Sequence, residues 1–149
     1  MSAALPHTAK AIVFTCMDER LSNHVEKIIH SLPGGAFHAA LAGGGGAFSF
    51  DSDKAVALKQ VIAAYHINKI TDIYLESHLS CGAYSLAGVT FADQTTEISR
   101  LHQDLATARR LITEALLAER VPAGTVHVHT RVIDLAGRPV KKPELAKAI

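Results

Sequence analysis

Residues 11–16 read Ala11-Ile-Val-Phe-Thr-Cys16, a continuous apolar and partly β-branched run that ends in a cysteine. Such a run is expected of a strand that is buried on both faces of a parallel sheet. The next segment, 25–32, has apolar residues at helical spacing, and Pro33-Gly34-Gly35 stops it. The chain is therefore predicted to begin with a strand, a loop and a helix.

The same alternation continues along the chain. Further strands are predicted at 37–42, 70–78 and 125–135, and further helices at about 51–66 and 93–120. Strands that alternate with helices predict an α/β fold with a mainly parallel central sheet of about four strands flanked by helices. A chain of 149 residues fits a single domain, 1–149. The glycines 43–46 are interpreted as a flexible loop packed near the functional site.

Composition excludes several classes of protein. The formal net charge of +1 gives no strong field to attract nucleic acid or an anionic membrane. No apolar run approaches the roughly 20 residues that cross a bilayer, and residues 1–10 lack the apolar core of a signal peptide. We therefore expect a cytoplasmic protein with a small-molecule substrate. Two cysteines are too few for a disulfide scaffold, so they are metal ligands, nucleophiles or core residues.

Two predicted strands end in residues that bind metals. Cys16 ends the first strand and His78 ends the third, and the carboxyl ends of parallel strands are where ligands bind. Cys81 follows three residues after His78, with Gly82 behind it. Thiolate and imidazole suit Zn²⁺, and three protein ligands with an open fourth position are typical of catalytic sites. The sequence therefore predicts a zinc site at Cys16, His78 and Cys81.

A charged pair lies next to the first cysteine. Asp18 and Arg20 are two residues apart, so in an extended segment their side chains point the same way. Asp18 is then expected to approach the metal, while Arg20 holds it by a bidentate ion pair. Two plainer interpretations stay open: Asp18 and Arg20 as a solvated surface pair, and Cys16 and Cys81 as ordinary buried cysteines or a disulfide.

The segments Cys16-Met-Asp-Glu-Arg20 and His78-Leu-Ser-Cys-Gly82 together resemble the paired signature of the β-class carbonic anhydrases. The resemblance extends over about residues 11–88. It implies a zinc ion held by Cys16, His78 and Cys81, with Asp18 and Arg20 as a dyad beside the fourth position. In a closed state of such enzymes the aspartate itself is the fourth ligand.

The resemblance also implies an activity and an assembly. The activity would be the reversible hydration of CO2 to bicarbonate by a zinc-bound hydroxide. Phe37 matches an aromatic residue that lines the substrate pocket at a subunit interface, and Gly82 is placed in the same pocket. The expected assembly is a homodimer or a higher homo-oligomer with shared sites.

Departures from the family pattern leave other functions open. Residues 40–43 read Ala-Leu-Ala-Gly where the family usually has Arg-Asn-Ala-Gly, and Ser77 stands where the family usually has glycine. These changes affect the pocket and leave the metal ligands in place. A related zinc hydrolase acting on CS2 or COS, and a catalytically lost zinc-stabilised binding module, are the alternatives. His127 and His129 are interpreted as a polar strand face, with a second metal site as the rival interpretation.

Overall fold

The structure, a computed structural model, describes residues 4–143. Four strands, β1 (Ala11–Cys16), β2 (Phe37–Leu41), β3 (Asp72–His78) and β4 (His127–Ile133), form one sheet in the order β2-β1-β3-β4. Every neighbouring pair is parallel. The predicted α/β class with a central sheet of four strands is thus confirmed, and the sheet is parallel throughout.

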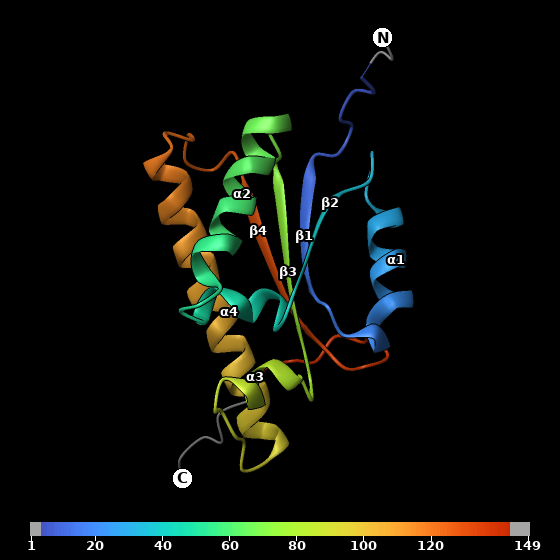
Figure 1. The fold of residues 1–149 in the computed structure, drawn as a ribbon, viewed down its shortest axis with the longest axis vertical. Coiled ribbons are helices and arrows are strands. Elements are labelled where there is room, and N and C mark those ends of the chain that lie inside the picture. The colour runs from blue at the N-terminus through green and yellow to red at the C-terminus, as the bar shows by residue number, and fades with distance from the viewer. Residues whose placement is uncertain (1–3, 144–149) are drawn as a thin grey trace.

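Helices cover both faces of the sheet. The α-helices are α1 (Ser22–Ser31), α2 (Lys54–Asn68), α3 (Gly82–Leu86) and α4 (Gln94–Ala118), and two 3-10 helices are η1 (Glu19–Leu21) and η2 (Gly44–Ser49). Figure 1 shows α1 on one face of the sheet and α2 with α4 on the other. The parallel strands run toward the end of the sheet where α3 lies (Figure 1). The carboxyl ends of the strands therefore meet beside α3.

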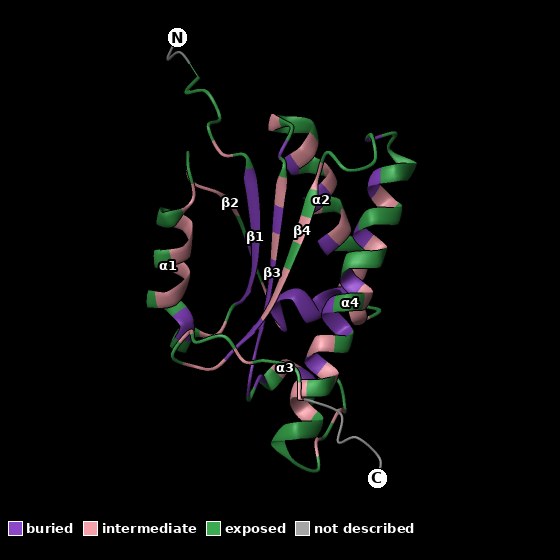
Figure 2. Cartoon of the chain, turned by 180° about the vertical axis from the view of Figure 1, so that it is seen from behind, coloured by how far each residue is buried: buried purple, intermediate pink, exposed green. Residues whose placement is uncertain are grey.

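The main core lies between the sheet and the pair α2 and α4. All six residues of β1 are buried, as a strand covered on both faces requires. Phe14 on β1 packs edge-on against Phe48 of η2, with their ring centroids 5.1 Å apart. By contrast, α1 contains no fully buried residue. Figure 2 accordingly shows α1 in the colours of intermediate and exposed residues.

The longest helix, α4, begins at a clear cap. The Asp93 side chain accepts a hydrogen bond from the Thr96 N–H at 2.7 Å, which satisfies one of the free donors at a helix start. The buried residues of α4 recur at helical spacing, as predicted: Leu101, Asp104, Leu105, Ala108, Ile112 and Leu116. Among residues 4–143, no helix combines the length and the apolar character that a membrane crossing requires.

The glycine run forms a buried 3-10 helix, so the prediction of a flexible loop was wrong. Gly44, Gly45 and Gly46 lie within η2, which Figure 2 shows as buried between the sheet and α4. A Cβ on Gly45 would lie 2.5 Å from Leu105 Cδ2, and one on Gly46 would lie 2.5 Å from the Tyr84 hydroxyl. The glycines are required because the backbone packs where no side chain fits. Composition alone does not show this lack of space.

Candidate metal centre

Three potential ligands converge at the carboxyl ends of two neighbouring strands. Cys16 is the last residue of β1, His78 is the last residue of β3, and Cys81 follows in the turn before α3. Their ligand atoms all lie within 4.8 Å of one another, and the two sulfurs are 3.7 Å apart. All three residues are buried. Within residues 4–143 this is the single such group of His, Cys, Asp and Glu side chains.

The imidazole of His78 is oriented for metal binding. Its Nδ1 lies 2.8 Å from the carbonyl oxygen of Leu79, so Nδ1 carries the proton and donates it. The lone pair of Nε2 then points toward the two sulfurs. Nε2 is buried and has no hydrogen-bond partner among the described residues. A buried polar atom without a partner is costly, and a metal ion at this position would satisfy it.

The pKa values of the two thiols are shifted in opposite directions. Donation by the Cys81 thiol lowers the pKa of Cys16 to about 4 against the opposing effect of burial, with help from His78 and from the N–H groups of Gly43 and Asp18. The pKa of Cys81 is raised, first by its bond to the Cys16 sulfur and then by burial. A site that already holds one thiolate needs to release fewer protons when a metal enters.

The donor set fits zinc. Two thiolates bound to one tetrahedral zinc at about 2.3 Å have their sulfurs about 3.8 Å apart, close to the 3.7 Å found between Cys16 and Cys81. Thiolate and imidazole together are ligands that zinc prefers. Three other histidines are paired with carboxylates elsewhere: His24 with Glu76, His66 with Glu119 and His129 with Asp72. The site therefore offers three protein ligands.

Asp18 lies beside this cluster and is held by Arg20. The Asp18 Oδ2 atom is 3.7 Å from His78 Nε2. Arg20 donates from Nε to Oδ1 at 2.9 Å and from Nη2 to Oδ2 at 2.6 Å, which is a bidentate pair. The Arg20 hydrogen bond is the largest of the effects that lower the pKa of Asp18 to about 2. Asp18 therefore remains a carboxylate at the edge of the cluster.

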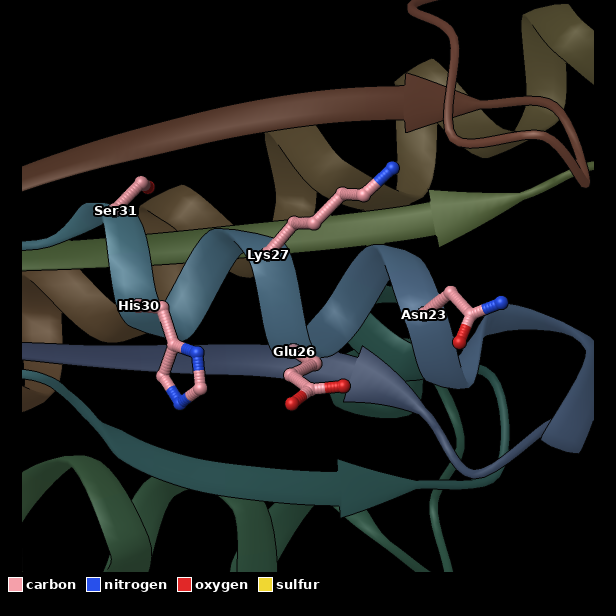
Figure 3. A pocket seen from close by; sticks show the side chains of 5 residues that line it. All are labelled: Asn23, Glu26, Lys27, His30 and Ser31. Carbon is pink, nitrogen blue, oxygen red and sulfur yellow. The ribbon is translucent and has the colours of Figure 1, made fainter.

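A cavity of about 390 Å³ reaches this edge of the site. Thr15, Cys16 and Asp18 line one part of it, and residues of α1 and β2 line the rest. Glu26 and His30 belong to this lining, and Figure 3 shows them on α1 above β1 and β2. They also border a second, open hollow along α1, whose lining includes none of the three ligands. The first cavity gives a small molecule access to Asp18.

The two residues predicted to line the substrate pocket lie in different places. Gly82 directly follows Cys81, is exposed, and has no atom near the position of a Cβ. Phe37 pairs in register with Ile12 and contacts His7, with ring centroids 5.6 Å apart. Four residues of strand separate Ile12 from Cys16, roughly 13 Å. Within one chain Phe37 therefore does not line the site.

Three residues of the site's surroundings were missed by sequence reasoning. The Ser80 N–H donates to Glu97 Oε1 at 2.5 Å, and the Ser80 carbonyl accepts from Arg20 Nη2 at 3.3 Å. The buried Tyr84 hydroxyl donates to Asp104 Oδ2 at 2.8 Å. Tyr84 matches no motif, and Glu97 and Asp104 lie at polar positions of the segment predicted as a helix at 93–120. Only the packing of α4 against the turn reveals these contacts.

The sequence matches no protein-family model, and no curated protein matches it. Solved structures do share its fold. A carbon disulfide hydrolase matches with a TM-score of 0.54 at 17% identity, over 95% of this chain and 82% of that one. A tetrameric β-carbonic anhydrase of Sordaria macrospora also gives 0.54 at 17% identity, over 95% and 84%. The β-carbonic anhydrase of Aspergillus fumigatus gives 0.52 at 16% identity, over 94% and 78%.

Proposed function

We propose that this chain is a divergent member of the β-carbonic anhydrases and catalyses the zinc-dependent, reversible hydration of CO2 to bicarbonate. The observation that carries the proposal is the convergence of the Cys16 and Cys81 sulfurs with the unpartnered Nε2 of His78, next to Asp18. The fold shared with β-carbonic anhydrases supports it. In this proposal residues 1–149 form one zinc domain.

In the proposed mechanism, some site residues bind the metal and others orient the attacking water. Cys16, His78 and Cys81 would hold zinc, which when bound supplies Lewis-acid chemistry that makes water a nucleophile near neutral pH. Asp18 is ionised and can only accept hydrogen bonds, so it would orient the attacking water toward the carbon of CO2. Arg20 would fix Asp18 through the bidentate pair. Placed 3.7 Å from His78 Nε2, Asp18 is also the proposed fourth ligand of a closed state.

The reaction forms one C–O bond and releases one proton, which must leave the site. His38 lines the cavity that reaches Asp18, and its Nε2 lies 2.7 Å from the Thr15 hydroxyl. Burial lowers the pKa of His38 below its ordinary value, so the imidazole is neutral near neutral pH and would pass on a proton that it receives rather than keep it. His38 or a solvent buffer would take the proton outward.

The proposed assembly is a cytoplasmic homodimer or a higher homo-oligomer. Met17, between Cys16 and Asp18, is a large apolar side chain that is 68% exposed in the single chain. A partner subunit covering this edge would bury Met17 and could bring Phe37 to the pocket. One of the structural neighbours is a tetrameric enzyme.

A second substrate class is supported by a specific finding. The carbon disulfide hydrolase shares the fold with a TM-score of 0.54. CS2 and COS resemble CO2 in shape and are attacked at the same central carbon. A site that activates water for one of these molecules has the groups needed for the others.

The test combines metal analysis with rate measurements on the purified protein. We expect about one zinc per chain by elemental mass spectrometry, and CO2 hydration above the buffer rate by stopped flow, with CS2 and COS assayed in parallel. Cys81→Ser should lose the metal, because three ligands are needed to hold it. Zinc without turnover on any of the three substrates would instead indicate a zinc-stabilised binding module.

A further inference from the structure

The turn that carries two of the three ligands contains a strained residue. Ser80 lies between His78 and Cys81 and has a φ of 58°, in the left-handed region. Residues with a side chain other than Asn or Asp rarely adopt this conformation, and it persists only where the surroundings hold it. The conformation matters because it sets the direction of the chain between the two ligands.

Both polar groups of the Ser80 backbone are held by charged side chains. Its N–H donates to the half-buried Glu97 carboxylate at 2.5 Å. Its carbonyl accepts from Arg20 Nη2 at 3.3 Å, and Arg20 is already fixed by Asp18. Both polar groups of this residue therefore have a partner, and Glu97 supplies the oxygen acceptor that holds the N–H.

Two helical turns further along, the same helix contacts α3, which directly follows the turn. The Tyr84 hydroxyl donates to Asp104 at 2.8 Å, and Asp104 also accepts from Arg100 Nε at 3.0 Å. Tyr84 is 1% exposed and Asp104 is 5% exposed, so this contact is inside the protein. Glu97 and Asp104 are seven residues apart, which places them on one face of α4.

We infer that α4 positions the metal-binding turn, with Glu97 holding Ser80 in its left-handed conformation so that His78 and Cys81 present their ligand atoms together. This inference rests on the proposed zinc site. Glu97 and Asp104 are positioning residues, since neither contacts the cluster. They act on the conformation of the turn before the metal binds. Their removal should therefore lower the affinity for zinc.

The first test compares two substitutions of Glu97 by chelator-competition titration. Glu97→Ala removes the acceptor and should weaken zinc binding by about tenfold or more, the range found when groups that orient metal ligands are removed. Glu97→Gln keeps an oxygen acceptor without the charge and should stay within about threefold of the parent protein. Glu114→Ala is the control, because Glu114 lies on α4 in an exposed pair with Arg110.

The second test asks whether the effect acts through Ser80. Glycine adopts positive φ without strain, so a Ser80→Gly chain needs less help to form the turn. We expect Glu97→Ala to weaken zinc binding by less than about threefold in a Ser80→Gly background, against tenfold or more in the parent. Circular dichroism of each metal-free variant checks that the fold is retained. Tyr84→Phe, which removes the second contact, should also weaken zinc binding.

The possible results separate this inference from the proposed function. Parent-like zinc affinity in Glu97→Ala would overturn the inference while leaving the zinc site intact. Equal losses of zinc affinity in Glu97→Gln and Glu97→Ala would indicate a charge effect and would also overturn the inference. An effect of Glu97→Ala on zinc affinity that is as large in the Ser80→Gly background as in the parent would overturn it too. A parent protein that binds no zinc would overturn the proposed function and the inference with it.

Discussion

The Asp18 carboxylate accepts three hydrogen bonds from Arg20: one from its backbone N–H at 3.0 Å and two from its guanidinium at 2.9 and 2.6 Å. These donors stabilise the ionised form and lower the pKa to about 2. The carboxylate is therefore present throughout the neutral pH range. The pair lies at the edge of the candidate metal centre, so it can act on a substrate without being needed to hold a metal.

Asp18→Asn should separate catalysis from metal binding. The amide keeps the shape but loses the charge that pairs with Arg20, so CO2 hydration should fall by on the order of 10²-fold. Zinc content should change little, because Cys16, His78 and Cys81 remain. Stopped-flow rates and elemental analysis, measured together from neutral to alkaline pH, check this.

Asp72→Asn is the matched control for that experiment. Asp72 also forms an ion pair, with His129, but it lies at the opposite end of β3 from His78. The control should hydrate CO2 at the parent rate. If Asp18→Asn also keeps the parent rate at every pH, the dyad has no catalytic role and the proposed mechanism is wrong.

The metal-free protein should carry one thiolate per chain well below neutrality. The pKa of Cys16 is lowered to about 4, so lowering the pH from 8 to about 6 leaves Cys16 ionised, whereas an ordinary thiol with a pKa of about 8.5 would be protonated. Thiolate absorbance in the ultraviolet measures this. Cys16→Ser is the control and should lose the signal, and a parent protein that loses it already between about pH 9 and 8 would contradict the assignment.

At the scale of elements, the strands and the convergence of Cys16, His78 and Cys81 could be predicted, whereas the contacts that hold the turn could not. Residues 11–16 were predicted with the bounds found, because a buried strand has an unmistakable apolar run. The helix at α3 was missed, since five residues are too few to show a helical period. The contact of Glu97 with Ser80 depends on how α4 packs, and no local pattern encodes that packing.

Two glycine substitutions test how tightly η2 is packed. Gly45→Ala places a Cβ 2.5 Å from Leu105 and 3.0 Å from Leu75, so it should lower the free energy of unfolding by about 1–3 kcal/mol. Gly82→Ala has no atom within 4 Å of the new Cβ and lies in the short helix α3, so it should be nearly neutral. Denaturant unfolding measures the free energy of unfolding of both variants. Equal values would show that the residues around η2 can move to make room for the added methyl group.

At the scale of the whole molecule, three features bear on the proposed assembly. Met17 is 68% exposed beside the cluster, and Phe37 lies near the other end of the sheet. The strand β2 is at one edge of the sheet, and an edge strand leaves backbone groups that a second chain can pair with. These features together favour a closed assembly of identical chains over a free monomer.

The protein should therefore be a homodimer or larger at micromolar concentration. Light scattering coupled to size exclusion gives the mass directly. Met17→Lys places a charge in the proposed interface and should shift the protein toward the monomer. Leu86→Lys, at an exposed apolar position on α3, serves as the control. A monomer that hydrates CO2 as fast as the parent would contradict a shared active site.

The contact of α4 with the turn between His78 and Cys81 has a consequence for the synthesis of the protein. A nascent chain that has left the ribosome as far as Gly82 already carries both cysteines, which are 65 positions apart, and His78 between them. It does not yet carry Glu97 or Asp104. If α4 sets the turn, the emerging polypeptide exposes two reactive thiols for the time needed to make at least twenty more residues, roughly one to a few seconds at cellular rates of synthesis. Tight binding of the metal would then follow translation. The two thiols would be most open to oxidation during that interval, above all where the metal is scarce.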